Sequence, residues 1–124
     1  LDLALMTLSD PAVLRSLSAR ARAGVHVRAL LADASWLPEN DAVATLLASL
    51  GVEVRFLTDY DLHAKVVIAD DAALLGSINL SMAALDLNRE VGVIVDDTDT
   101  MAALSACFED DWASAVAWTP SVGP

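Results

Sequence analysis

Short runs of β-branched and aliphatic residues alternate along this chain with segments that have helical periodicity. Continuous apolar runs of this length are typical of strands in a largely buried sheet. The alternation predicts an α/β fold in which helices cover both faces of a mixed sheet, an α/β/α sandwich. The runs with strand character are the opening stretch LDLALMTL and residues 25–31, 52–57, 66–68, 74–75 and 91–95.

Three longer segments between these runs carry helix start and stop signals. The first covers residues 10–24, with Asp10 as the cap and Pro11 at the first helical position. The second covers residues 38–51, and the last starts near residue 98 and stops near residue 120. Their predicted apolar faces consist of Val13, Leu14 and Leu17, then Val43, Leu46, Leu47 and Leu50, then Met101, Leu104, Phe108 and Trp112.

Length and charge limit the classes of protein that this chain can represent. Its 124 residues are enough for one domain, with no internal boundary. An excess of 18 acidic over 7 basic residues gives a net charge of −11, which disfavours a purely electrostatic grip on nucleic acid. The single cysteine, Cys107, excludes an intrachain disulfide, and its apolar neighbours predict a buried, inert thiol. High Ala and Asp content is typical of a GC-rich bacterial genome.

The ends of the chain predict that it is a fragment of a longer protein. It lacks an initiating Met and opens on a stretch that reads as a strand already under way, and it ends at WTPSVGP soon after the last helix. No uncharged apolar run reaches the ~18 residues that span a bilayer. We expect a cytoplasmic or membrane-associated domain.

The stretch LHAKVVIADDAALLGSIN places polar side chains in what otherwise reads as a buried hairpin. Alternation along a strand sends His63 and Lys65 to the same face. After a turn, the return strand brings Ser77 and Asn79 back towards the level of His63 and Lys65. An ammonium and an amide suit phosphoryl oxygens, and Gly76 would let the backbone approach closely. A second interpretation is an exposed strand face followed by a turn that caps a helix.

These residues resemble the signature of the phospholipase D superfamily, the HKD motif H-x-K, four residues, D, followed by G-S-x-N. Asn88 and Glu90 in NREVGVIVDD match the N-x-E before the next strand of that family, and ARAGVHVRALLAD resembles an earlier strand. The resemblance spans nearly the whole chain and implies a phospholipase D-like half-domain. The matching positions of the signature are His63, Lys65, Asp70, Gly76, Ser77 and Asn79.

The resemblance implies a two-histidine mechanism on a phosphodiester. One histidine attacks phosphorus in line and forms a phosphohistidine, while a second, from another copy of the motif, protonates the leaving oxygen. His63 would be the nucleophile or the general acid. Lys65 and Asn79 would hold the non-bridging oxygens, with assistance from Ser77.

The family pattern also implies supporting roles for two acidic residues. Glu90 would accept a proton from the far ring nitrogen of His63 and fix its tautomer. Asp70 would be a structural ion-pair partner and not a direct participant. No metal and no cofactor are implied.

This chain holds one motif, whereas the mechanism needs two. His26 lacks the lysine two residues on and the following GSxN, so it does not form a second copy. The second motif comes either from a missing N-terminal half of a two-motif enzyme or from a homodimer. The mid-strand start favours the first source.

The resemblance implies phosphodiester hydrolysis or phosphatidyl transfer, as in cardiolipin synthases and phospholipases D. Phospholipid is the expected substrate, with peripheral membrane contact, because the acidic balance argues against nucleic acid. One alternative is a homodimeric endonuclease. Another is a non-catalytic, protein-binding member, although the intact motif residues argue against it.

Other polar and aromatic residues carry weaker signals. His26 reads as a satisfied or exposed strand histidine, and Trp112 as part of the core. Trp36 follows a strand end and is a candidate for lining the pocket. Arg55 and Arg89 are conceivable phosphate contacts that no motif supports.

Overall fold

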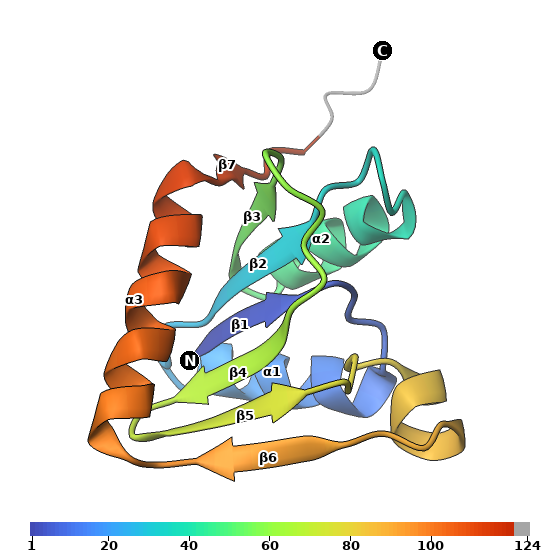
Figure 1. The fold of residues 1–124 in the computed structure, drawn as a ribbon. Coiled ribbons are helices and arrows are strands. Elements are labelled where there is room, and N and C mark those ends of the chain that lie inside the picture. The colour runs from blue at the N-terminus through green and yellow to red at the C-terminus, as the bar shows by residue number, and fades with distance from the viewer. Residues whose placement is uncertain (121–124) are drawn as a thin grey trace.

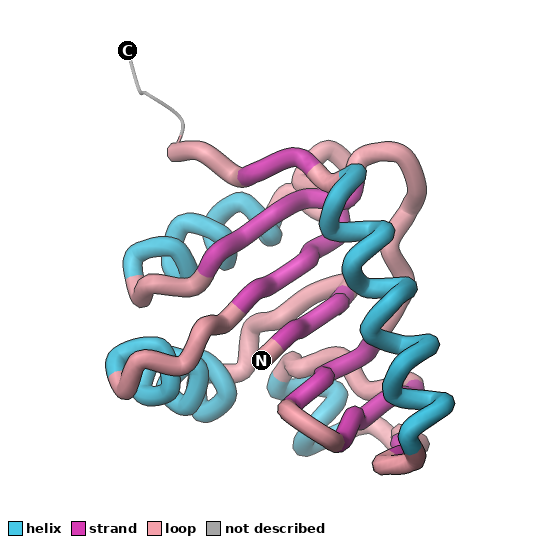
Figure 2. Tube along the Cα trace, turned by 90° about the vertical axis from the view of Figure 1, so that its left-hand side faces the viewer, coloured by secondary structure: helices cyan, strands magenta, loops and turns pink. Residues whose placement is uncertain are grey.

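Residues 1–120, the part described by the computed structural model, form three layers, with α1 and α2 on one face of a sheet and α3 on the other (Figures 1 and 2). The predicted α/β/α sandwich is therefore confirmed. The strands are β1 (Asp2–Leu5), β2 (Arg28–Ala32), β3 (Glu53–Leu57), β4 (Lys65–Ala69), β5 (Ala72–Gly76), β6 (Gly92–Val95) and β7 (Val116–Ala117). The helices are α1 (Pro11–Arg22), α2 (Glu39–Ser49), the short π-helix η1 (Ala83–Leu87) and α3 (Thr98–Ser114).

The sheet is mixed, with the strand order β6-β5-β4-β1-β2-β3-β7. The first three strands are parallel to one another, and β4, β5 and β6 follow as antiparallel neighbours. The predicted β4–β5 hairpin is confirmed, and Asp70 takes a positive φ of 52° in its turn. In the β1–β4 register Lys65 lies opposite Leu5, so the start of β4 is at the carboxyl end of β1.

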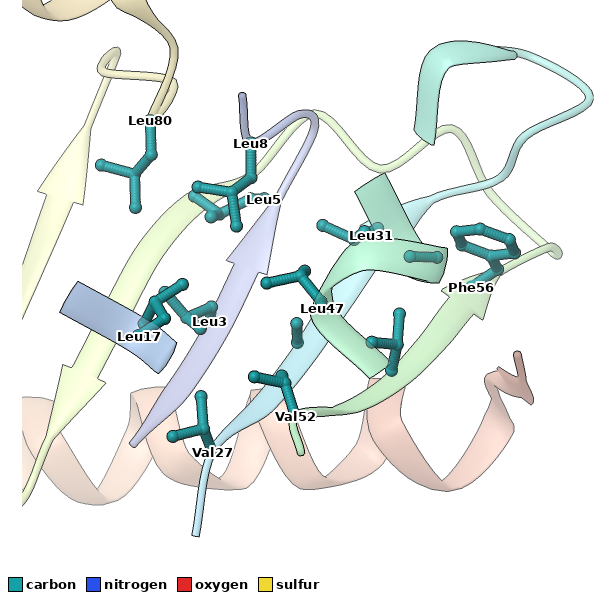
Figure 3. Close-up of a cluster of buried hydrophobic side chains, with 13 residues drawn as sticks. Leu3, Leu5, Leu8, Leu17, Val27, Leu31, Leu47, Val52, Phe56 and Leu80 are labelled. Atoms are coloured by element: carbon teal, nitrogen blue, oxygen red, sulfur yellow. The ribbon is translucent and has the colours of Figure 1, made fainter. Parts of the chain in front are cut away.

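Two apolar clusters hold the layers together. One lies between the sheet and the pair α1 and α2, with Leu17 and Leu47 among its buried members (Figure 3). The other packs Met101, Phe108 and Trp112 of α3 against the opposite face, as predicted. Leu46 was expected in the core but is 43% exposed, because α2 contacts the sheet through Ala44 and Leu47 instead. No helix among residues 1–120 is long and apolar enough to cross a membrane.

Two arginines hold α3 against the sheet. Arg28 forms ion pairs with Asp2 at 2.7 Å and with Glu109 at 2.6 Å, and these hydrogen bonds raise its pKa. Arg55 donates to the carbonyl oxygen of Trp112 at 2.8 Å, with its guanidinium 4.6 Å from the Trp112 ring. Arg55 is therefore occupied structurally, and the idea that it contacts phosphate is not supported.

The end of one helix, the start of one strand and the exposure of the cysteine differ from the sequence predictions. The last helix ends at Ser114, because the chain becomes extended at Ala115 and pairs with β3 as β7. The strand predicted from residue 25 begins only at Arg28. Cys107 is exposed rather than buried, because it lies beside the inward stripe of α3 and not at its centre. The tail WTPSVGP extends past the described part of the chain, because its residues 121–124 lie outside it.

Candidate active site

The predicted site residues lie at one end of three neighbouring strands. Lys65 is the first residue of β4, and exposed His63 precedes it. Ser77 directly follows β5, and Glu90 comes shortly before β6. Because β5 runs antiparallel to both its neighbours, its end meets the starts of β4 and β6 (Figure 1). The sheet thus gathers residues that are far apart in sequence at one rim.

Lys65 is a buried cation with an N–H donor that its contacts leave unused. Its side chain belongs to a residue only 8% exposed, and its Nζ donates to the carbonyl oxygen of His63 at 2.7 Å and lies 3.8 Å from Met6 Sδ. Burial lowers the pKa of Lys65, while the nearby Glu90 carboxylate acts in the opposite direction. Within residues 1–120 no carboxylate forms a salt bridge with this ammonium. An ammonium has three N–H donors, so a donor remains for an anion.

Glu90 is held by two neighbouring side chains. The Ser77 hydroxyl donates to one carboxylate oxygen, and Asn88 Nδ2 donates to the other at 3.1 Å. These bonds, Ser77 first, lower the pKa of Glu90, and the Lys65 charge acts in the same direction. The carboxylate is therefore ionised at neutral pH. Among the hydrogen bonds of residues 1–120 none joins Glu90 to His63, so the expected orienting role stays a prediction.

Gly76 brings the backbones of β5 and β6 close together. A Cβ placed on it would lie against the carbonyl oxygen of Val91 and 2.8 Å from Gly92 Cα. The next residue, Ser77, donates its N–H to that Val91 carbonyl at 2.9 Å, and its Oγ accepts from Val91 N at 3.0 Å. The missing side chain at Gly76 thus allows the loop that positions Ser77.

We expect Gly76→Ala to lower the free energy of unfolding by about 1–3 kcal/mol, because the added methyl meets backbone that cannot rotate away. Urea unfolding followed by circular dichroism measures this. Gly92→Ala is the matched control, since the two glycines are paired and its Cβ would meet only the flexible ends of Ile78 and Leu74. Equal losses in the two variants would contradict the steric explanation.

The remaining motif residues have different environments. Asn79 is half-buried, and its side-chain oxygen has no hydrogen-bond partner within residues 1–120. Asp70 lies at the hairpin turn, separated from His63 by the length of β4. Asp70 is exposed and makes no ion pair among the described residues, so the expected ion-pair role stays a prediction.

Three residues near the site had been assigned no role from the sequence. Asn88 supports Glu90, and Met6 contacts Lys65. Asn40 is fully buried, and its Nδ2 donates to the carbonyl oxygens of Met6 at 2.9 Å and Ala32 at 2.8 Å. It therefore ties together the chain segments at the carboxyl ends of β1 and β2, next to Lys65. Of these, only Asn88 had a sequence signal, the N-x-E match.

The weaker candidates lie outside this cluster or have no contact with it. His26 is exposed, with Nε2 3.3 Å from the Glu53 carboxylate, as expected for a surface histidine. Trp36 lies in the loop between β2 and α2 and is partly exposed, and its place in a pocket stays a prediction. Arg89 is exposed, and no salt bridge within residues 1–120 involves it.

Comparisons with known proteins find a matching family and relatives over most of the chain. Residues 1–112 match the family model described as "Cardiolipin synthase, PLD-like domain". The chain is 34% identical over 116 residues to cardiolipin synthase 2 of Bacillus anthracis. This alignment covers 84% of this chain and 21% of the synthase. It is 32% identical over 114 residues to mitochondrial cardiolipin hydrolase of Mus musculus, covering 90% of this chain and 51% of the hydrolase.

Solved structures share the fold at lower sequence identity. The phospholipase D family member Nuc from Salmonella typhimurium has a TM-score of 0.81 at 22% identity, covering 96% of this chain and 82% of Nuc. NucT from Helicobacter pylori has a TM-score of 0.81 at 21% identity, covering 94% of this chain and 80% of NucT. The chain spans only about a fifth of the synthase and half of the hydrolase above. From the match over residues 1–112 we conclude that the chain belongs to the phospholipase D-like domain family of cardiolipin synthases.

Proposed function

We propose that this domain supplies one half of a phosphodiester-processing site and that His63 forms a phosphohistidine. The observation that carries this proposal is the buried Lys65 ammonium, which donates to the backbone carbonyl oxygen of exposed His63 and keeps an unused donor. A buried cation without a salt bridge is costly, so it is retained where an anion will bind. A phosphoryl group is the anion that this family membership favours.

In the proposed reaction a ring nitrogen of His63 attacks phosphorus in line. The P–N bond forms as the bond to the leaving oxygen breaks, and that oxygen takes a proton from a second histidine. Lys65 and Asn79 donate to the non-bridging oxygens, where charge develops in the transition state. Water or an alcohol then attacks the phosphohistidine, which breaks the P–N bond and frees His63.

Glu90 supports this chemistry from the neighbouring strand. Ser77 and Asn88 keep its carboxylate ionised, as the lowered pKa of Glu90 indicates. In the proposed site this negative charge stabilises the positive charge that His63 acquires on phosphorylation. A reorientation of the His63 ring towards Glu90 on substrate binding would provide the tautomer control expected from the family pattern.

An apolar surface beside the site supports the need for a second motif-bearing domain. We call it the β6 edge surface; it consists of exposed apolar side chains on both faces of β6 and in the segment before it. These are Leu87, Val91, Val93 and Ile94, which are 80%, 73%, 52% and 77% exposed. β6 is an outer strand of the sheet, so one row of its backbone groups is unpaired. Exposed apolar surface of this kind marks an interaction site. The second domain, from a preceding half or a second copy, would bring the general acid.

Phospholipid is the proposed substrate class. The matching relatives are named cardiolipin synthases and cardiolipin hydrolases, and the net charge of −11 opposes binding to a polyanion. A phosphatidyl group transferred to His63 would pass to water in hydrolysis or to an alcohol in synthesis. Formation of phosphatidylethanol and free glycerol from phosphatidylglycerol vesicles and ethanol is the expected result. DNA cleavage without any lipid product would contradict this substrate assignment.

The chemistry itself can be tested with bis(p-nitrophenyl) phosphate, whatever the source of the second motif. Nitrophenolate leaves without protonation, so His63 should react even in a lone domain and give a burst of about one equivalent per chain. If copies of the chain pair and complete the site, we expect continuous turnover by a dimer in light scattering. A chain that gives neither a burst nor turnover would contradict the proposal.

A further inference from the structure

The helices α1 and α2 cover one face of the sheet (Figure 2). A groove of about 490 Å³ is lined by residues of α1 and of the α2 side. Its apolar lining includes Leu14 of α1 with Leu46 and Leu50 from the α2 side, and Arg15 and Arg22 of α1 also line it. None of these residues belongs to the candidate active site. The groove therefore requires an explanation of its own.

The apolar lining is not fully used in packing the domain. Leu46 is 43% exposed, although the periodicity of its helix predicts a core position. Leu14 and Leu50 are only partly buried. The helix pair thus presents aliphatic side chains to solvent along a concave surface, which suits an aliphatic ligand.

The two arginines provide the polar part of the groove. Arg15 and Arg22 are two helical turns apart, so their side chains lie along one side of α1. Neither takes part in a salt bridge within residues 1–120, whereas Arg28 and Arg55 are both paired with carboxylates. In a chain with 18 acidic and 7 basic residues, two unpaired cations at one apolar groove are a local exception. This charge pattern is complementary to an anion that carries aliphatic chains.

We propose that the α1–α2 groove binds an anionic phospholipid of a membrane surface, with acyl chain against the leucines and headgroup phosphate at Arg15 and Arg22. Nucleic acid is a poorer match, because aromatic side chains, which stack on bases, do not line the groove. The groove begins at Pro11, and the preceding Asp10 donates its N–H to the carbonyl of Leu80, next to Asn79. The Pro11 end of the groove therefore lies near the loop that carries part of the candidate site.

Vesicle sedimentation of the 124-residue chain tests this proposal. We expect binding to vesicles of equimolar phosphatidylglycerol and phosphatidylcholine and weak binding to phosphatidylcholine alone. Arg15→Ala and Arg22→Ala should each weaken binding about fivefold, as for one basic residue near an anionic surface. Leu46→Ser should weaken it with no change of charge, and Arg15→Lys should restore most of the binding lost in Arg15→Ala.

Arg20→Ala is the matched control, because it removes the same charge from the same helix but does not line the groove. An equal loss in Arg20→Ala would mean diffuse electrostatic attraction and would overturn the proposal. Full binding of vesicles by Leu46→Ser would also overturn it. So would a result in which Arg15→Ala and Arg22→Ala lose binding to a single-stranded DNA probe but not to vesicles. His63→Ala should bind vesicles normally while it loses turnover, so failure of the groove and failure of the proposed chemistry are distinguishable.

Discussion

His63→Ala is expected to abolish the nitrophenolate burst and to lower any steady turnover by at least about 10³-fold, because His63 is the proposed nucleophile. The fold should not change. His63 is exposed and precedes β4, and it accepts a hydrogen bond from Lys65 through its backbone carbonyl, which the variant keeps. Burst amplitude and thermal unfolding of the same sample measure both effects.

His26→Ala is the matched control for this substitution. It removes the other histidine of the chain, which is exposed and pairs with Glu53 at the surface. A surface ion pair of this kind contributes about 0–1 kcal/mol, so stability and turnover should both stay close to those of the parent chain. A similar loss of activity in the two variants would show that the assay does not report on His63.

Lys65→Met is expected to reduce the rate of phosphoenzyme formation roughly 10²–10³-fold, because it removes a donor from the developing charge. Met retains the length and apolar stem of the buried lysine. Arg20→Met controls for net charge, as Arg20 is exposed and remote in sequence from the motif. Rates that agree for the parent chain and Lys65→Met would exclude a catalytic role for the ammonium.

The same variant should be at least as stable as the parent chain at neutral pH. Burial lowers the pKa of Lys65 below its usual value of 10.5, so the charged form destabilises the folded state at every pH below the lowered pKa. As the pH rises from there towards 10.5, the folded chain becomes neutral and this penalty fades. The stability advantage of Lys65→Met should therefore shrink in that alkaline range, which urea unfolding at several pH values can measure.

Local signals made most of the fold predictable. Asp10 does cap α1, accepting hydrogen bonds from Ala12 N and Val13 N, because cap chemistry depends on neighbouring residues only. The end of the last helix was not predictable in this way. Nothing near Ser114 marks a stop, and the chain leaves the helix because Val116 pairs with Phe56 of a distant strand. Leu46 was misplaced for a similar reason, since the contact of α2 with the sheet through Ala44 and Leu47 decides which side of the helix is covered.

The candidate site was predictable only as far as the motif extends. Strand alternation and the hairpin bring Lys65 and Ser77 to one rim, and the N-x-E match indicated Glu90. Asn40 was not predictable, because an asparagine in the first turn of a helix ordinarily faces solvent. Its burial follows from the contact of α2 with the ends of β1 and β2, which no local pattern encodes.

The central claim is that His63 becomes covalently bonded to phosphorus. Its most direct test is peptide mapping by mass spectrometry after brief reaction with bis(p-nitrophenyl) phosphate and an alkaline quench, which preserves phosphohistidine. We predict a nitrophenyl phosphate adduct on His63, absent from His63→Ala and unchanged in His26→Ala. An adduct on Ser77 or on His26 instead, with His63 unmodified, would contradict the claim.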